Sequence, residues 1–359
     1  MSALDWLVIL AYLAVMLYIG YHSMKTVKTD EDFVLAGRNV GNIYIILSLF
    51  ASFTGLSGLF GTPQYVYEYG IAGWWWWATF PIGVFIMGMT MAKLLRRRMH
   101  VTLPDVVDVN HSSKAVRVAA SLVTVWNYLA WTAGQVAGIV LVITTFTDLN
   151  GTAAVIVAYI IIVLFTLLGG FRAVVYTDSL QAVLFLVVLG LVIPAVLLLH
   201  YDVPEALAQT TSIDGFYKLF GSVPAGTMIT WWLLAPACFI DNMALQRVFA
   251  AKDEKSAKGN ITAAFLLMII FGLILMFIGI MARFILPAGS DPASAMLNLS
   301  QLVLPKGMLG LLGWLFPPPV LPFWYVPPPW SRMSTPSCET QERKSRPLLY
   351  WSTGCLWCW

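Results

Sequence analysis

Glycine and proline interrupt two long apolar segments of this chain, where the backbone itself could supply chemistry. Gly55, Gly58, Gly61 and Pro63 lie within nine residues of one segment, and Ala235-Pro236-Ala237 lies in the middle of another. These residues weaken or remove hydrogen bonds within a helix, so they free carbonyls and amides that must face the interior of a helix bundle. Freed groups of this kind can hold ions or a small polar solute.

A carboxylate, Asp178, stands near the start of a further apolar segment. An ionised carboxylate is costly at the edge of a membrane unless it faces water or a cation. The other interpretation is that Thr177 or Asp178 caps the helix that starts here, which would stabilise the helix by about 0.3–1 kcal/mol. The two interpretations are compatible, and the sequence leaves both open.

The residue patterns typical of common enzymes do not occur in the sequence. It has no His-Glu-x-x-His pattern and no Gly-x-x-x-x-Gly-Lys loop, and Leu59 stands where a Gly-x-Ser-x-Gly elbow needs its last glycine. The four cysteines form no metal-binding or disulfide pattern. We therefore expect a protein that is not an enzyme, with no catalytic residues and no cofactor.

The candidate residues lie within eight apolar segments, each long enough to cross about 30 Å of hydrocarbon as a helix. Apolar residues make up 59% of the chain and charged residues 11%, and the mean hydropathy is +0.78, which excludes a water-soluble core. The predicted spans are residues 4–22, 42–66, 72–95, 115–147, 152–168, 176–199, 226–246 and 261–285.

Basic residues alternate between the gaps that separate these spans. With the N-terminus outside, fourteen Lys and Arg residues fall in or beside the inner gaps and three in or beside the outer gaps. Cytoplasmic loops carry such an excess of basic residues, so the alternation predicts a multi-pass protein with this orientation.

The two interrupted spans, 42–66 and 226–246, are five helices apart. An inverted repeat of five helices predicts this separation, with the broken first helix of each half meeting at the middle of the membrane. The alternative is that Gly and Pro, which are common in membrane helices, merely allow close packing.

The chain changes character after Phe316. A ninth apolar segment, 302–316, runs into seven prolines between Pro317 and Pro329, more than a spanning helix tolerates. We therefore predict a transmembrane core over residues 1–316, with eight complete spans and an aborted ninth, and an aberrant Pro/Trp/Cys-rich tail over residues 317–359. A reading-frame artefact or a damaged terminus would explain such a tail.

Four stretches, in order along the chain, resemble the sodium:solute symporter family. They are Phe33–Arg38, Thr102–Asp105, Gly169–Gln181 and Gln246–Lys252. The third is the most specific, because it is similar to the family's signature of a Gly-Gly turn followed by Ala-Val, Thr-Asp and Gln. The matching residues are Gly169, Gly170, Ala173, Val174, Thr177, Asp178 and Gln181.

The resemblance implies an all-α transmembrane fold, a partial five-plus-five inverted-repeat bundle of the leucine-transporter type with one extra N-terminal helix. It also implies sodium-coupled import of a small organic solute by alternating access in the cytoplasmic membrane, with sodium as the only metal. Ala51 and Thr54 match the family's carbonyl ligands, and Asp178 a cytoplasmic-side sodium station. The alternatives are helix packing for Ala51 and, for Thr54, a hydroxyl bonded to its own helix.

The solute is expected beside the two breaks, where aromatic walls and a few amides suit a small polar molecule. Each Trp could instead belong to packing or to an interfacial belt, the role we assign to Trp74–Trp77. The candidate solute-binding residues are Gly55, Gly58, Trp126, Trp131, Gln135, Trp231, Trp232 and Asn242. Asp241 and Asn242 could also serve only to contact Arg247.

In the family that the chain resembles, the ninth span supplies hydroxyl ligands to sodium, and here the proline-rich tail replaces it. We therefore expect impaired transport by the chain as written. The alternatives are a membrane sensor or regulatory fragment on a transporter scaffold, and a non-functional gene remnant. The expected partners are sodium, a small organic solute and the lipid bilayer, but not nucleic acid. The sequence does not specify the solute, the choice of sodium or proton as coupling ion, or the oligomeric state.

Overall fold

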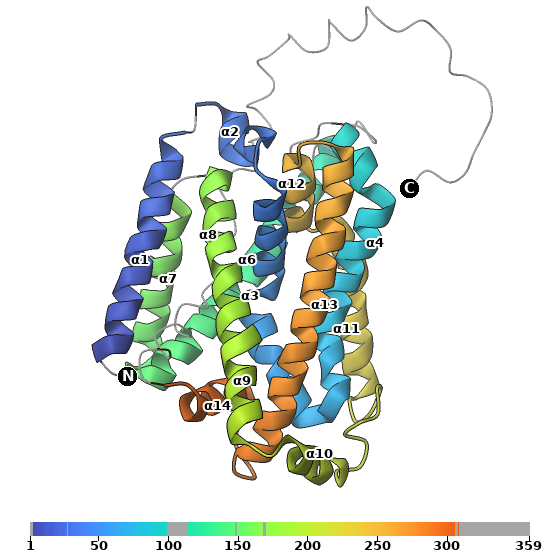
Figure 1. Cartoon of the computed structure of the whole chain (residues 1–359). Coiled ribbons are helices and arrows are strands. Elements are labelled where there is room, and N and C mark those ends of the chain that lie inside the picture. The colour runs from blue at the N-terminus through green and yellow to red at the C-terminus, as the bar shows by residue number, and fades with distance from the viewer. Residues whose placement is uncertain are drawn as a thin grey trace, which may run out of the picture. The chain divides into compact units, whose positions relative to one another are not determined.

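The computed structural model describes residues 3–26, 28–98, 114–147, 149–167, 170–305 and 308 (Figure 1). All of the regular secondary structure in these ranges is helical. The predicted tail over 317–359, the Thr102–Asp105 motif and Gly169 lie outside the described residues.

A helix stands at each of the eight predicted spans. The long helices are α1 (Ala3–Met24), α3 (Asn42–Tyr69), α4 (Trp75–Arg97), α6 (Lys114–Phe146), α7 (Gly151–Leu167), α8 (Gly170–Val187) continued by α9 (Ile193–His200), α11 (Ala225–Ala237) followed by α12 (Asn242–Ala250), and α13 (Glu254–Ile285). In the described residues outside these spans, three short α-helices occur: α2 (Asp30–Leu35), α10 (Val203–Thr211) and, after the eighth span, α14 (Ala295–Val303).

Four helical stretches in the described ranges are long and apolar enough to cross a membrane: Asn42–Arg97, Ser121–Thr145, Gly170–His200 and Glu254–Ile285. The first contains both α3 and α4, so these stretches account for five of the eight predicted spans. The other three correspond to α1, to α7 and to the interrupted pair α11 and α12, whose apolar parts are shorter.

Helix α3 lies at the centre of the described helices, packed against α13, α4 and α8 (Figure 1). Glycines on two of these helices make room for one indole ring. A Cβ atom at Gly58 or at Gly272 would lie within 2.5 Å of an atom of Trp77. Trp77 is only 3% exposed, and its Nε1 donates to the carbonyl of Met268 in α13 at 2.9 Å. The prediction that Trp77 belongs to an interfacial belt is therefore wrong, because this side chain fills the core.

Both predicted helix breaks occur, the second one slightly later than expected. In α3, Gly55 has φ 28° and ψ 167°, a conformation that is not helical and that favours glycine. In the seventh span, α11 runs through Pro236 to Ala237, and a 3-10 turn and an extended Asp241 then separate it from α12. The proline is tolerated near the end of α11, and the chain reorients after it.

The sixth span begins earlier than predicted, at Gly170 and not at Tyr176. It continues through a π-helical turn, Val188–Val192, into α9. Pro194 lies in the first turn of α9 and cannot donate a backbone hydrogen bond, which accounts for the irregular turn before it.

Helices α2 and α12 lie at the same end of the bundle (Figure 1). Two arginines that the sequence assigns to inner gaps contact the end of α12 and the residues that follow it. Arg38 Nη1 donates to the carbonyl of Phe249 at 2.9 Å, and Arg96 Nη2 donates to the carbonyl of Lys252 at 3.0 Å. The N-terminal end of α1 lies at the opposite end, with α10 and α14. The two arginines thus lie at the end of the bundle opposite to the N-terminus, as the alternation of basic residues predicts.

Candidate cation and solute site

Four polar side chains from three helices meet in the buried interior, and we call them the ion-pair cluster: Ser48 and Ser52 of α3, Asp178 of α8 and Arg247 of α12. Asp178 Oδ2 accepts a hydrogen bond from Ser48 Oγ at 2.6 Å and one from Ser52 Oγ at 3.0 Å. Arg247 Nη2 donates to the same carboxylate oxygen at 2.9 Å and to Ser52 Oγ at 2.6 Å, and Arg247 Nε donates to Ser48 Oγ at 3.2 Å.

The local sequence explains how these side chains come together. Ser48 and Ser52 are four residues apart, so they share one face of α3 in the helical turns that precede the break. Asp241 caps α12 by accepting from the amide of Met243 at 2.6 Å, and Arg247 follows one and a half turns later. The cluster thus joins the first half of one broken span to the second half of the other.

Because the ion-pair cluster is buried, the loss of one of its polar partners would lower the stability of the protein. Asp178 is 2% exposed and Arg247 is 1% exposed. Taking two ions out of water costs several kcal/mol each, and their attraction offsets this only when further hydrogen bonds satisfy the remaining polar atoms. The two serine hydroxyls supply such bonds by linking the carboxylate to the guanidinium.

The structure excludes one of the two interpretations left open for Asp178, because this residue does not cap a helix: α8 starts eight residues earlier, at Gly170. Asp241 caps α12 and interacts electrostatically with Arg247, but the carboxylate that forms the ion pair with Arg247 is that of Asp178. The sequence did offer one signal for the cluster, since two serines one turn apart in an apolar span need polar partners.

The described part of the signature motif packs α8 against α2 and α1. A Cβ atom at Gly170, where φ is 64°, would lie 2.9 Å from the carbonyl oxygen of Phe33, so glycine allows this close approach. Thr177 Oγ1 donates to the carbonyls of its own helix at 3.0 Å, and Gln181 Nε2 donates to the hydroxyl of Tyr12 at 2.9 Å. Ala173 and Val174 are buried. Apart from Asp178, the described residues of the motif make contacts that position α8.

At the break in α3, the backbone contacts α6. The amide of Leu56 donates to Gln135 Oε1 at 3.3 Å, and a Cβ atom at Gly55 would lie 3.5 Å from the indole of Trp131. Ala51 and Thr54 are fully buried just before the break. The Thr54 hydroxyl donates to the carbonyl of Phe50 at 2.5 Å, as the packing alternative expected, which leaves its backbone carbonyl as the candidate ligand.

Most of the other residues predicted to bind the solute do not gather at the break. Trp231 is buried against Tyr65, with ring centroids 4.9 Å apart, and Trp232 lies 4.9 Å from Trp75, so both belong to an aromatic cluster on α3, α4 and α11. Trp126 is 74% exposed on α6, and the structure does not bring it to the site. The indole of Trp77 packs against Gly58 and fills the space beside it. The side chain of Asn242 is not among those that the structure describes.

A cavity of about 250 Å³ adjoins the second half of α3 immediately after the break. Polar groups of Ser57, Gln64 and Trp76 line it, with Gly134 and Gly138 of α6 opposite. Trp76 Nε1 donates to the carbonyl of Ser57 at 3.2 Å. The sequence interpretation did not assign these residues to a solute site, although Ser57 and Gln64 follow Gly55 on the broken helix and Gly134 and Gly138 lie on α6, which contacts the break.

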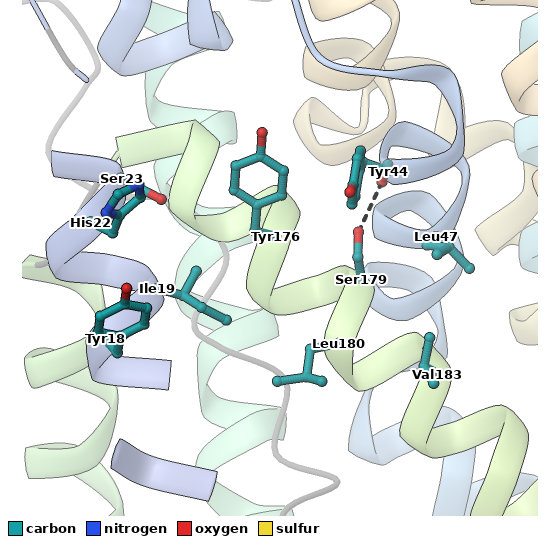
Figure 2. Close-up of a pocket in the computed structure, with 10 residues that line it drawn as sticks. All are labelled: Tyr18, Ile19, His22, Ser23, Tyr44, Leu47, Tyr176, Ser179, Leu180 and Val183. Carbon is teal, nitrogen blue, oxygen red and sulfur yellow. Dashed lines mark hydrogen bonds between the residues drawn. The ribbon is translucent and has the colours of Figure 1, made fainter. Parts of the chain in front are cut away.

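A second, more open groove of about 420 Å³ lies between α1, α3 and α8 (Figure 2). Tyr18, Ile19, Leu47, Leu180 and Val183 give it a hydrocarbon lining, and its only drawn hydrogen bond joins Ser179 to the carbonyl of Tyr44. A small polar solute would gain few hydrogen bonds here. The cavity beside the break is therefore the better candidate for a solute.

Comparisons with known proteins agree with this architecture. The family model described as "Sodium:solute symporter family" matches residues 33–317. The chain is 27% identical over 219 residues to sodium/proline symporter 2 of Staphylococcus saprophyticus, covering 58% of this chain and 42% of that protein. It is 28% identical over 187 residues to the sodium/pantothenate symporter of Escherichia coli (strain K12), covering 50% and 38%. The chain thus spans about two fifths of the length of these curated relatives.

A solved structure of a Na⁺-coupled sialic acid symporter, in a substrate-bound outward-open state, superposes on 89% of this chain and 69% of that chain. The TM-score is 0.71 and the sequence identity is 19%. This likeness confirms the predicted all-α inverted-repeat fold.

Proposed function

Because the chain belongs to the sodium:solute symporter family, we propose that it acts in sodium-coupled uptake of a small organic solute by alternating access. It is a multi-pass membrane protein with the fold of a secondary transporter. We further propose the cell membrane as its location, with the N-terminus outside, on the strength of the basic residues in alternate gaps.

The break at Gly55 is the observation that carries this proposal. It lies in the most central helix, with Ala51 and Thr54 fully buried beside it. A carbonyl oxygen freed from its helix in a buried place has no water to bond with, and a hard cation such as sodium prefers oxygen ligands. We propose that the carbonyls of Ala51 and Thr54 hold sodium.

Asp178 is the second proposed sodium station, and the ion-pair cluster suggests how it would work. The carboxylate and the hydroxyls of Ser48 and Ser52 converge on one guanidinium, which therefore occupies a set of three oxygens that would also suit sodium. Sodium and Arg247 compete for these oxygens in this proposal. Binding of sodium would release Arg247, and with it α12, from α3 and α8.

For the solute, we propose the cavity beside the break, which Ser57, Gln64 and Trp76 line. Trp131 and Gln135 contact the break itself, at Gly55 and Leu56. The relatives and the structural neighbour transport proline, pantothenate and sialic acid by name, so these three solutes form the first test panel. The expectation that the 359-residue chain transports poorly stays a prediction.

Sodium binding tests the proposal without requiring transport. Purified protein in detergent should bind ²²Na⁺ saturably, and Asp178→Asn should weaken this binding because it removes the charge but keeps the shape of the side chain. The exposed Asp214→Asn is the matched control, since Asp214 pairs only with Lys218 at 3.3 Å on the surface. Absence of saturable binding in the unmodified protein, with proton-driven uptake of a panel solute, would contradict sodium as the coupling ion.

A further inference from the structure

The side chain of Gln135 replaces part of the backbone hydrogen bonding of α3 at its break. In an unbroken helix, the amide of Leu56 would donate to the carbonyl of Ser52, four residues earlier. In the structure, this amide donates to Gln135 Oε1 of α6 at 3.3 Å, and both partners are buried. Gln135 is only 4% exposed, so water does not compete freely for the bond.

The same turn of α6 also accommodates the side chain of Leu56. A Cβ atom at Gly138, three residues after Gln135, would lie 2.7 Å from Leu56 Cβ. At Gly55, a Cβ atom would lie 3.2 Å from Gln135 Nε2. Glycine on each helix therefore allows the two backbones to approach until the glutamine reaches the amide.

A buried amide that loses its partner is strongly disfavoured, so the position of the break depends on what accepts from Leu56. Without an acceptor on α6, the amide of Leu56 would return to the carbonyl of Ser52. This change would straighten α3 at Gly55. Straightening would also withdraw the freed carbonyls from the interior.

We propose that Gln135 is a positioning residue that holds α3 open at Gly55 and so sets the geometry of the sodium-binding carbonyls of Ala51 and Thr54. This differs from direct contact with the solute, the role that its residue type first suggested. The part of this inference that concerns sodium binding rests on the proposed function. The hydrogen bond between Gln135 and Leu56 can be tested without sodium.

The test compares two substitutions at one position. Gln135→Met removes the acceptor and nearly keeps the volume, and Gln135→Glu keeps an acceptor oxygen at the same reach. Gln209→Met is the matched control, because the side chain of Gln209 is exposed and bonds to Glu205 on the same helix, α10. Two quantities are measured in detergent: hydrogen exchange at the amide of Leu56 without sodium, and the affinity for ²²Na⁺.

Gln135→Met should slow exchange at Leu56 by about tenfold or more, because the amide returns to a regular helical bond with the carbonyl of Ser52, and should weaken sodium binding by about tenfold or more. Gln135→Glu should stay within about threefold of the unmodified protein in both, and Gln209→Met should change neither. Unchanged or faster exchange in Gln135→Met would overturn the inference. Slower exchange with unchanged sodium affinity would overturn the positioning role, as would loss of sodium binding in Gln135→Glu.

A second pair of variants covers the case in which Gln135→Met does not fold. Leu56→Pro removes the amide proton itself, and proline is tolerated in the first turn of a helix segment. In that background, adding Gln135→Met should produce folded protein with thermal stability unchanged from Leu56→Pro alone. Further destabilisation would show that Gln135 acts through another contact and would overturn the inference. If the unmodified protein binds no sodium, the proposed function fails, while exchange at Leu56 still decides the role of Gln135.

Discussion

Removing Arg247 should destabilise the protein far more than removing an exposed lysine of the same charge. Arg247→Met leaves the carboxylate of Asp178 buried, at 2% exposure, with only the hydroxyls of Ser48 and Ser52 as partners. Breaking a buried pair by removing one partner costs about 3–5 kcal/mol, because an uncompensated charge stays in the interior. We expect a loss of this size in the free energy of unfolding.

The double variant Asp178→Asn/Arg247→Met removes both charges, and the asparagine amide can still bond to the two serines. It should therefore recover at least about 2 kcal/mol of the loss, since replacing a buried ion pair as a whole is often close to neutral. Lys218→Met is the control, because Lys218 and its partner Asp214 are both largely exposed, and such pairs contribute about 0–1 kcal/mol.

Equilibrium unfolding in detergent micelles, followed by circular dichroism in sodium-free buffer, measures these differences. The reasoning would be refuted if Arg247→Met and Lys218→Met lowered the free energy of unfolding equally. It would also be refuted if the double variant lost as much of this free energy as Asp178→Asn and Arg247→Met lose together as single variants. Either result would mean that Asp178 and Arg247 do not depend on each other in the folded protein.

Three further predictions concern other parts of the chain. Gly170→Ala should destabilise the protein by about 1–3 kcal/mol in the same unfolding assay, because φ is 64° there and the added Cβ would meet the carbonyl of Phe33; equal stability would contradict the close contact. At the start of α13, hydrogen bonds from Ser256 hold the pKa of Asp253 below its ordinary value, so its cap is present at neutral pH and is lost as the pH falls through that lowered pKa. Hydrogen exchange in the first turn of α13, corrected for the intrinsic rate, should therefore rise on acidification, and Asp253→Asn should abolish that rise. Proteoliposomes made from residues 1–359 should show little sodium-driven uptake of any panel solute, and robust uptake would refute the expectation of impaired transport.

Local signals in the sequence were enough to predict most of the helices and both breaks, although the second break occurs slightly later than predicted. The glycines from Gly55 to Gly61 identify the interrupted part of α3, because they weaken the helix where they stand. Pro236 was less informative, since a helix can carry a proline near its end and turn only after it. The start of α8 was placed too late because Gly170, with a left-handed φ, still begins a regular helix.

The candidate site was less predictable, because its contacts join residues that are far apart in the chain. Asp178 and Arg247 are 69 residues apart, and Ser48 and Arg247 are 199 apart. The sequence shows that each charge is unusual in an apolar segment but not which partner it finds. Trp77 shows the same limit, since a tryptophan at the end of a span suits the interface or the core equally well until its neighbours are known.

Binding of ²²Na⁺ to the unmodified protein and to Gly55→Ala tests the central claim most directly, namely that the break in α3 holds the cation. Gly55 has a positive φ, and a Cβ atom there would lie 3.2 Å from Gln135 Nε2, so alanine would strain the break by about 1–2 kcal/mol or close it. The account predicts saturable binding to the unmodified protein and an affinity about tenfold lower or worse in Gly55→Ala, the change that 1.4 kcal/mol produces. Equal affinity in the two proteins would contradict it.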